Sequence, residues 1–300
     1  MKNKYIFLGD MNSVNVEIIA KSYPLLKGKL KYILLGNIYD LKRYLLRIRS
    51  KLKINEILNP LDFGEFNERY INIFNIENNN SKKYKNLLNQ LTIANTLSNI
   101  TKYDLVTMPI NKEVFKKHIR FIGLTEYLGE INRKKTLMLM HGEKFSIIPF
   151  TTHINPKYVS KNLKNEILNK FIKNLQKMVI EKRYNLNFKY IKFLCYNPHC
   201  GENNKLGDED NKIKKLLSKF KNIKGPYPAD SAFVSINRKT LFISTYHDQA
   251  LIPFKALNDK GINMTLGLDY RRISPAHGTA LDIKYKNISD NTSYIECMKI

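Results

Sequence analysis

The chain has 300 residues and carries 51 lysine and arginine residues against 26 aspartate and glutamate residues, a formal net charge of +25 at pH 7. A chain of this length buries a large core and lies near the size at which one core divides into two lobes. The charge is spread along the whole chain and no nucleic-acid recognition motif accompanies it, so nucleic acid is not expected as a partner. An anionic substrate would still be attracted by the positive electrostatic field of the protein.

The first eight residues contain only a short apolar run, Tyr5 to Leu8, which ends at Gly9. This run is too short for a signal peptide or a membrane span, so no membrane partner is expected. Cys195, Cys200 and Cys297 form no CxxC pair, and their odd number argues against a disulfide framework. We therefore expect a soluble, reduced, cytoplasmic protein.

Strand-like and helical segments alternate along the first third of the chain, which is typical of an α/β fold. Residues 5–8 and 32–35 are expected to be short buried strands, and Asp40 is a candidate N-cap for a helix over 41–52. A loop at 77–81 precedes an expected helix over 83–100 with leucines on one side.

The pattern continues through the middle of the chain. A strand begins at residue 104 and ends in polar residues, and two strands, 136–140 and 145–150, flank an expected hairpin turn at His141. A long amphipathic helix is expected from Ser160, its candidate N-cap. No internal repeat or clear linker divides the chain, which leaves open a lobe built from both termini.

Three histidines, His153, His199 and His247, each follow an apolar, strand-like run. In an open sheet such positions lie along the carboxyl edge, where ligands bind. Neutral imidazoles bind divalent transition metals, and three protein ligands leave positions open for a substrate oxygen. The pattern predicts a metal-assisted enzyme, although any one of these histidines could instead be a capping or core residue.

The remaining histidines differ in their surroundings. His118 lies in a basic stretch and His141 in the expected hairpin turn, so both are predicted to be solvated. His277 lies in Ser-Pro-Ala-His-Gly-Thr-Ala over residues 274–280 and is a candidate functional residue.

Eight motifs between about residues 104 and 282 closely resemble, in order, those of the 4-hydroxythreonine-4-phosphate dehydrogenases of vitamin B6 synthesis. Such ordered agreement is more specific than any one motif. They are Met108-Pro-Ile-Asn-Lys112, Gly123-Leu-Thr-Glu126, Thr151-Thr-His153, Asn197-Pro-His-Cys-Gly-Glu202, Gly225-Pro-Tyr-Pro-Ala-Asp230, Tyr246-His-Asp-Gln-Ala-Leu-Ile-Pro-Phe-Lys255, Gly261-Ile-Asn-Met-Thr-Leu-Gly-Leu268 and Arg272-Ile-Ser-Pro-Ala-His-Gly-Thr-Ala-Leu-Asp282.

The resemblance implies the two-lobed α/β fold of the isocitrate and isopropylmalate dehydrogenases, with the active site in the cleft between lobes. We expect a discontinuous cofactor-side lobe from residues 1–120 plus 255–300, and a central metal-binding and dimerisation lobe from 121–254. The family also implies a homodimer with a shared active site.

The activity implied is oxidation of the C3 hydroxyl of 4-phosphooxy-L-threonine to 2-amino-3-oxo-4-phosphooxybutanoate, which decarboxylates to 3-amino-2-oxopropyl phosphate. The hydride passes to NAD, with NADP left open. The resemblance makes His153, His199 and His247 ligands of a divalent cation, and zinc, cobalt, manganese and magnesium all remain open.

The resemblance also implies substrate-binding residues, and Lys255 and Arg272 have the charge that a phosphate or carboxylate requires. Asp230 and Asp248 could orient metal ligands or handle protons, or could be turn and capping residues. The implied substrate-binding set is Thr125, Lys255, Asn263 and Arg272.

For the cofactor, no G-x-G-x-x-G follows the first strand, so a Rossmann site is not indicated. Residues His277, Gly278 and Thr279 instead resemble the adenosine-binding loop of the wider isocitrate and isopropylmalate dehydrogenase group.

Two departures from the family pattern keep other functions open. The family's glycine-rich Gly-Asp-Pro-Ala-Gly-Ile-Gly-Pro-Glu appears here as Gly9-Asp-Met-Asn-Ser-Val-Asn-Val-Glu17, and Leu124 replaces a substrate-contacting histidine. Losing one such contact costs ~1–3 kcal/mol of substrate binding. The alternatives are a related metal- and NAD-dependent dehydrogenase acting on another β-hydroxy acid, and a non-catalytic basic RNA-binding protein.

Overall fold

The computed structural model describes residues 3–300 in two compact units. Unit 1 combines Met1–Lys135 with Leu268–Ile300, and unit 2 is Thr136–Gly267. Both boundaries lie later in the chain than the expected ones after residues 120 and 254. The reason is that α4 (Leu124–Ile131) packs into the core of unit 1 through Leu128, while β11 (Gly261–Leu266) pairs with β6 of unit 2.

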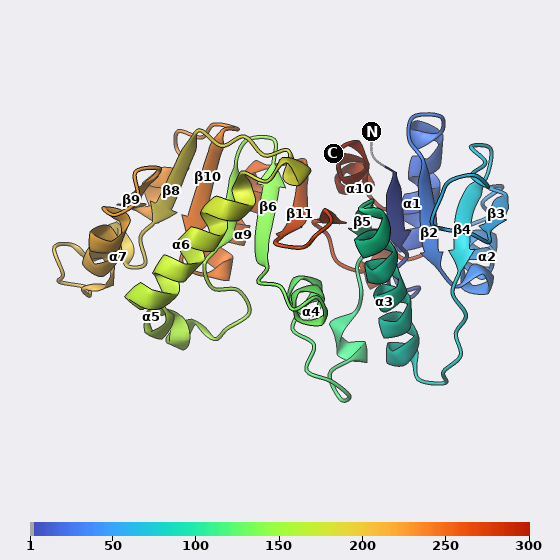
Figure 1. Ribbon diagram of the computed structural model, residues 1–300, viewed down its shortest axis with the longest axis horizontal. Helices are drawn as coiled ribbons and strands as arrows, with labels where there is room; N and C mark the ends of the chain where they lie inside the picture. Colours follow the sequence, from blue (N-terminus) through green and yellow to red (C-terminus); the bar gives the residue numbers. More distant parts are fainter. Residues whose placement is uncertain (1–2) are drawn as a thin grey trace. The chain divides into compact units, whose positions relative to one another are not determined.

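The strands of unit 1 are parallel and follow the order β3-β4-β2-β1-β5-β12 (Figure 1). Parallel sheets are covered on both faces, which accounts for the fully buried runs in β1, β2 and β5. The strands are β1 (Lys4–Phe7), β2 (Tyr32–Gly36), β3 (Ile54–Ile57), β4 (Ile71–Asn75), β5 (Asp104–Thr107) and β12 (Arg272–Pro275).

The helices of unit 1 cover this sheet. The helix α3 contacts β1, β2 and β5, burying Leu87, Leu91 and Ala94, while α1 contacts α2 and α10, and α10 contacts β12 (Figure 1). Their bounds are α1 (Asn15–Leu26), α2 (Ile38–Arg47), α3 (Lys83–Thr101) and α10 (Thr292–Lys299), with short 3-10 turns η1 (Lys112–Val114) and η5 (Leu281–Ile283).

The strands expected at 5–8 and 32–35 and the helix expected at 83–100 are confirmed within a few residues. The cap expected at Asp40 is wrong, because the helix begins earlier, at Ile38. Its N-cap is Asn37, whose side-chain oxygen accepts from the backbone N–H of Asp40 at 3.0 Å.

The strands of unit 2 follow the order β11-β6-β7-β10-β8-β9. Along the sheet, β7, β10, β8 and β9 are parallel to one another, whereas β6 is antiparallel to both β11 and β7. The bounds are β6 (Leu137–Gly142), β7 (Ser146–Pro149), β8 (Tyr190–Leu194), β9 (Ile223–Tyr227) and β10 (Thr240–Ser244).

The helices of unit 2 lie against these strands. The helix α9 contacts β6, β7 and β10, and an aromatic cluster of Phe145, Phe233, Phe242 and Phe254 fills the core beneath it. The bounds are α5 (Val159–Asn162), α6 (Asn165–Val179), α7 (Glu209–Leu217), α8 (Ala229–Ala232) and α9 (His247–Leu257), with 3-10 turns η2 (Pro156–Tyr158), η3 (Lys182–Tyr184) and η4 (Pro198–Gly201).

The long helix expected from Ser160 is two helices. Leu163 leaves the helical region with ψ 35°, and α6 restarts after Lys164. Ser160 therefore lies inside the short α5 and is not the N-cap of α6. Of the apolar face predicted for the long helix, Ile167 is 42% exposed, whereas the other members are buried, namely Leu163, Phe171, Leu175, Met178 and Val179.

Two further expectations are corrected. His141 lies on β6 and not in the hairpin turn. Its Nδ1 is 2.8 Å from Ser146 Oγ, and burial lowers its pKa to about 4, so it is not a solvated residue. Cys195 and Cys200 form a disulfide with their Cα atoms 5.1 Å apart, contrary to the expectation of a reduced chain.

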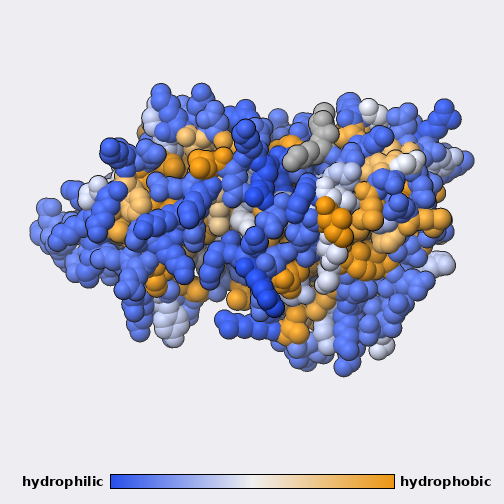
Figure 2. Space-filling model, in the orientation of Figure 1, coloured by the Kyte–Doolittle hydropathy of each residue, from blue (hydrophilic) through white to orange (hydrophobic). Residues whose placement is uncertain are grey.

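Hydrophilic residues dominate the face shown in Figure 2, in keeping with the large excess of lysine and arginine. Within residues 3–300, every helix is either too short or too polar to cross a bilayer.

Candidate active site

The three strand-end histidines follow three neighbouring parallel strands of unit 2. His153 follows β7, His247 follows β10 and His199 follows β8, and β10 lies between the other two. Ser244 pairs with Pro149, and Ile243 pairs with Phe193, so the three strands end almost level. The expected position at one carboxyl edge is confirmed.

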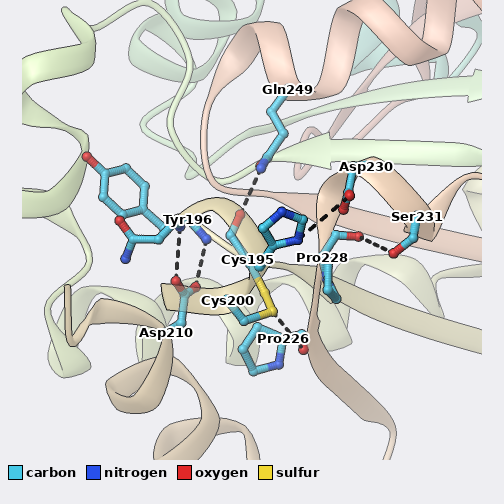
Figure 3. The surroundings of a disulfide bond; sticks show 11 residues. Cys195, Tyr196, Cys200, Asp210, Pro226, Pro228, Asp230, Ser231 and Gln249 are labelled. Carbon is cyan, nitrogen blue, oxygen red and sulfur yellow. Dashed lines mark hydrogen bonds and ion pairs between the residues drawn. A yellow bond between two sulfur atoms is a disulfide. The ribbon is translucent and has the colours of Figure 1, made fainter. Parts of the chain in front are cut away.

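The helix α9 ties two of these strand ends together through Gln249. Its Oε1 accepts the backbone N–H of Thr245, after β10, at 2.8 Å, and its Nε2 donates to the carbonyl of Cys195, after β8, at 2.8 Å (Figure 3). Sequence reasoning missed this residue, although it directly follows Asp248 in a motif that was singled out. Gln249 thus links the two strand ends that precede His247 and His199.

His153 and His247 lie together. Their ring centroids are 5.5 Å apart, and His247 Nδ1 is 2.6 Å from Asp248 Oδ1. A carboxylate on one ring nitrogen fixes the tautomer and leaves Nε2 to face a ligand. The structure thus brings Asp248 to a position from which it can orient His247.

His199 lies in the 3-10 turn η4 and has a left-handed backbone, with φ 46°. Its imidazole is 64% exposed, and Nδ1 is 3.9 Å from Oδ2 of Asp230 on α8. Within residues 3–300, no three or more His, Cys, Asp or Glu side chains are arranged to hold a metal ion. As they lie, the imidazoles of His153 and His247 are neighbours, and His199 faces Asp230.

In unit 1, Arg272 and Thr125 are brought together in the interior. Arg272 is 2% exposed, and its guanidinium donates to the hydroxyls of Thr107 (2.9 Å from Nε) and Thr125 (3.5 Å from Nη1). Burial lowers the pKa of Arg272 to about 10, so it remains protonated at neutral pH. Sequence reasoning missed Thr107, whose only signal was its place at the polar end of an expected strand.

In unit 2, the two other predicted substrate residues differ in exposure. Lys255 is exposed in the last turn of α9. Asn263 lies on β11, and its Oδ1 is buried with no hydrogen-bond partner among the described residues. A buried amide oxygen without a partner is costly unless a ligand or water satisfies it.

The predicted cofactor loop lies in unit 1. His277 Nδ1 is 2.9 Å from the carbonyl oxygen of Gly278, which can only accept, so Nδ1 carries the proton and Nε2 is an acceptor. Nε2 is buried with no partner among the described residues, and burial lowers the pKa of His277. The imidazole is therefore neutral and has one acceptor available for a ligand.

The altered N-terminal loop contacts the cofactor loop, since Val14 N–H donates to the Thr279 carbonyl at 3.1 Å. Gly9, with φ +70°, is the glycine that the backbone requires, because a Cβ there would lie 2.5 Å from the Pro109 carbonyl. Residues 11–15 have no positive φ, so their side chains are compatible with this backbone. Asn15 holds the loop by donating to the Leu8 carbonyl at 2.9 Å.

Leu124, the second departure, is the first residue of α4 and packs, partly buried, against the core of unit 1. Its side chain cannot donate or accept a hydrogen bond, so the polar side chains in the first turn of this helix are those of Thr125 and Glu126.

Comparisons with known proteins show which family the chain resembles. The family model "Pyridoxal phosphate biosynthetic protein PdxA" matches residues 29–300. The 4-hydroxythreonine-4-phosphate dehydrogenase of Hydrogenobaculum sp. is 32% identical over 311 residues, covering 100% of this chain and 99% of the relative. That of Campylobacter fetus is 33% identical, covering 98% of this chain and 95% of the relative. The crystal structure of the Klebsiella pneumoniae enzyme of that name superposes with a TM-score of 0.81 at 25% identity, covering 100% of this chain and 99% of the other.

Proposed function

The chain belongs to the PdxA family of pyridoxal phosphate biosynthetic proteins, and we propose that it oxidises 4-phosphooxy-L-threonine with NAD as the hydride acceptor. It is an oxidoreductase of vitamin B6 synthesis, as its relatives are named 4-hydroxythreonine-4-phosphate dehydrogenases. The observation that carries the proposal is the row of histidines after three adjacent parallel strands in a chain that matches this family over most of its length.

The loop of His277, Gly278 and Thr279 is proposed to bind NAD. The buried Nε2 of His277, which has no hydrogen-bond partner within residues 3–300, supports this, since an adenosine amino or hydroxyl group could donate to it. NAD bound at this loop would supply the acceptor for the hydride that leaves the carbon bearing the substrate hydroxyl. Burial lowers the pKa of His277, which favours the neutral imidazole and so favours an acceptor at Nε2.

Arg272, Thr125, Lys255 and Asn263 are proposed to bind the substrate. Arg272 keeps a full charge in the interior, which suits a phosphate or carboxylate, and the hydroxyl of Thr125 lies beside it. Asn263 offers a buried amide oxygen to a hydroxyl or ammonium group. Oxidation at C3 produces a β-keto acid, which loses carbon dioxide readily.

His153, His199 and His247 are proposed to hold a divalent cation. Imidazole donors suit a transition metal, and the contact of Asp248 with His247 is typical of the support given to metal-ligating histidines. Such a cation would polarise the substrate hydroxyl. The imidazoles of His153 and His247 are already neighbours, and the His199 side chain must turn away from Asp230 to join them as a third ligand.

A cytoplasmic homodimer with a shared active site is also proposed. Unit 2 exposes the apolar side chains of Val234 (84%) and Ile252 (69%), which a partner subunit could cover. Sedimentation analysis of the wild type and of Val234→Lys tests this, with a shift from dimer to monomer expected for the variant. A monomeric wild type would contradict the proposal.

The test of the activity is NADH formation from 4-phosphooxy-L-threonine with added divalent metal. We expect turnover by the wild type, its loss in His247→Ala, and full retention in the control His118→Ala, which changes an exposed histidine outside the proposed site. NADH formation only with another β-hydroxy acid would favour the related dehydrogenase, and tight, salt-sensitive RNA binding without turnover would favour the RNA-binding alternative.

A further inference from the structure

A pair of cysteines flanks the turn that carries His199. Cys195 directly follows β8 and is 1% exposed, whereas Cys200 lies in η4 and is half-buried. The two are joined as a disulfide, with Cα atoms 5.1 Å apart (Figure 3). The bond therefore links a strand end to the residue next to a proposed metal ligand.

We propose that Cys195 and Cys200 are a reversible redox site whose disulfide holds His199 away from His153 and His247, and whose reduction allows His199 to join them. The inference rests on the proposed metal-binding role of the three histidines. Its natural reactants are small thiols and small disulfides of the glutathione type.

The backbone of the turn supports this restraint. Six consecutive residues, from His199 to Asn204, have φ values between 44° and 80°. Residues other than glycine disfavour this left-handed region, so such a run persists only where its surroundings hold it. A covalent link from Cys200 to the strand end is one such restraint.

Hydrogen bonds hold the base of the turn independently of the disulfide. The carboxylate of Asp210 accepts the backbone N–H groups of Tyr196 at 2.7 Å and Asn197 at 2.9 Å (Figure 3). Reduction therefore leaves the base in place and releases the tip of the turn, where His199 lies.

The exposure of the two sulfur-bearing residues fits thiol–disulfide exchange. A small thiolate attacks the sulfur of the half-buried Cys200, the S–S bond breaks, and Cys195 leaves as a thiolate that takes up a proton. A second small thiol then displaces Cys200 from the mixed disulfide. The protein gains two thiols, and two small thiols become one small disulfide. The freed Cys200 thiol has the Pro226 carbonyl, 3.7 Å from Sγ, as an acceptor.

The test uses the full chain without metal in buffers of varied reduced-to-oxidised glutathione ratio. Alkylation and mass measurement give the fraction of paired Cys195 and Cys200, and Co²⁺ titration gives the metal affinity of each form. We expect one reversible two-electron transition and Co²⁺ binding at least about tenfold tighter in the reduced form. Absence of the transition, or equal affinities, would overturn the proposal.

Two variants separate the switch from other effects. Cys200→Ser cannot form the disulfide, so it is expected to bind Co²⁺ as tightly as the reduced wild type at every glutathione ratio. Weak Co²⁺ binding by this variant would mean that the Cys200 thiolate itself is a metal ligand, and would overturn the proposal. Cys297→Ser, the buried free cysteine, should keep the redox response. Equal NADH turnover of both redox forms would refute the switch alone, whereas no turnover by the reduced form would refute the proposed activity.

Discussion

Replacing Arg272 by lysine tests whether this guanidinium binds the anionic end of the substrate. The guanidinium donates to Thr107 and Thr125 at once, and a lysine ammonium cannot reproduce that fork. Loss of one charge-assisted hydrogen bond costs about 1.5–3 kcal/mol, so kcat/KM should fall roughly 10- to 150-fold. Steady-state NADH formation at varied substrate concentration measures this change.

The neighbouring Arg271→Lys is the matched control. Arg271 donates to the carboxylate of Asp104 and to the carbonyl of Ile300, so it has a structural role. We expect this control to lower stability to urea while leaving KM unchanged. The assignment of Arg272 would be refuted if its lysine variant kept a normal kcat/KM.

Three further predictions concern buried groups. Asp104→Asn removes the carboxylate that lies 3.0 Å from the buried ammonium group of Lys4, which keeps the Ile300 carbonyl as an acceptor. The free energy of unfolding in urea should therefore fall by about 3–5 kcal/mol, and an unchanged unfolding midpoint would contradict this. Burial lowers the pKa of His141 to about 4, whereas the unfolded chain has a histidine pKa of roughly 6.5. The free energy of unfolding should therefore be greatest above pH ~6.5 and should fall by at most about 3 kcal/mol as the pH is lowered toward 4. His141→Gln should remove this pH dependence. His277→Ala should raise the Kd for NADH about tenfold in a fluorescence titration without changing substrate KM, and an unchanged Kd would argue against the cofactor loop.

The positions of the three histidines could be predicted because apolar runs mark buried strands, and parallel strands end at one edge. Helix starts were less predictable. Asp40 and Ser160 have side chains suited to capping, but Asn37 caps one helix and a break at Leu163 divides the other. Residue types that can cap a helix occur in every polar segment, so the local sequence does not show which of them is the N-cap.

The disulfide could not be predicted because it depends on a turn that local propensity disfavours. The Cα atoms of Cys195 and Cys200 lie 5.1 Å apart at a turn whose residues 199–204 take left-handed conformations. The burial of His141 was missed for a different reason, since its Gly-containing surroundings suggested a turn, whereas β6 continues to Gly142 and pairs with β11.

The most direct measurement of the central claim is the stoichiometry of the reaction with 4-phosphooxy-L-threonine, NAD and a divalent metal. We expect one NADH and one carbon dioxide for each substrate molecule consumed by the reduced protein, and neither product from His247→Ala. Substrate left unconsumed by the folded, reduced, metal-supplied wild type would contradict the proposed activity.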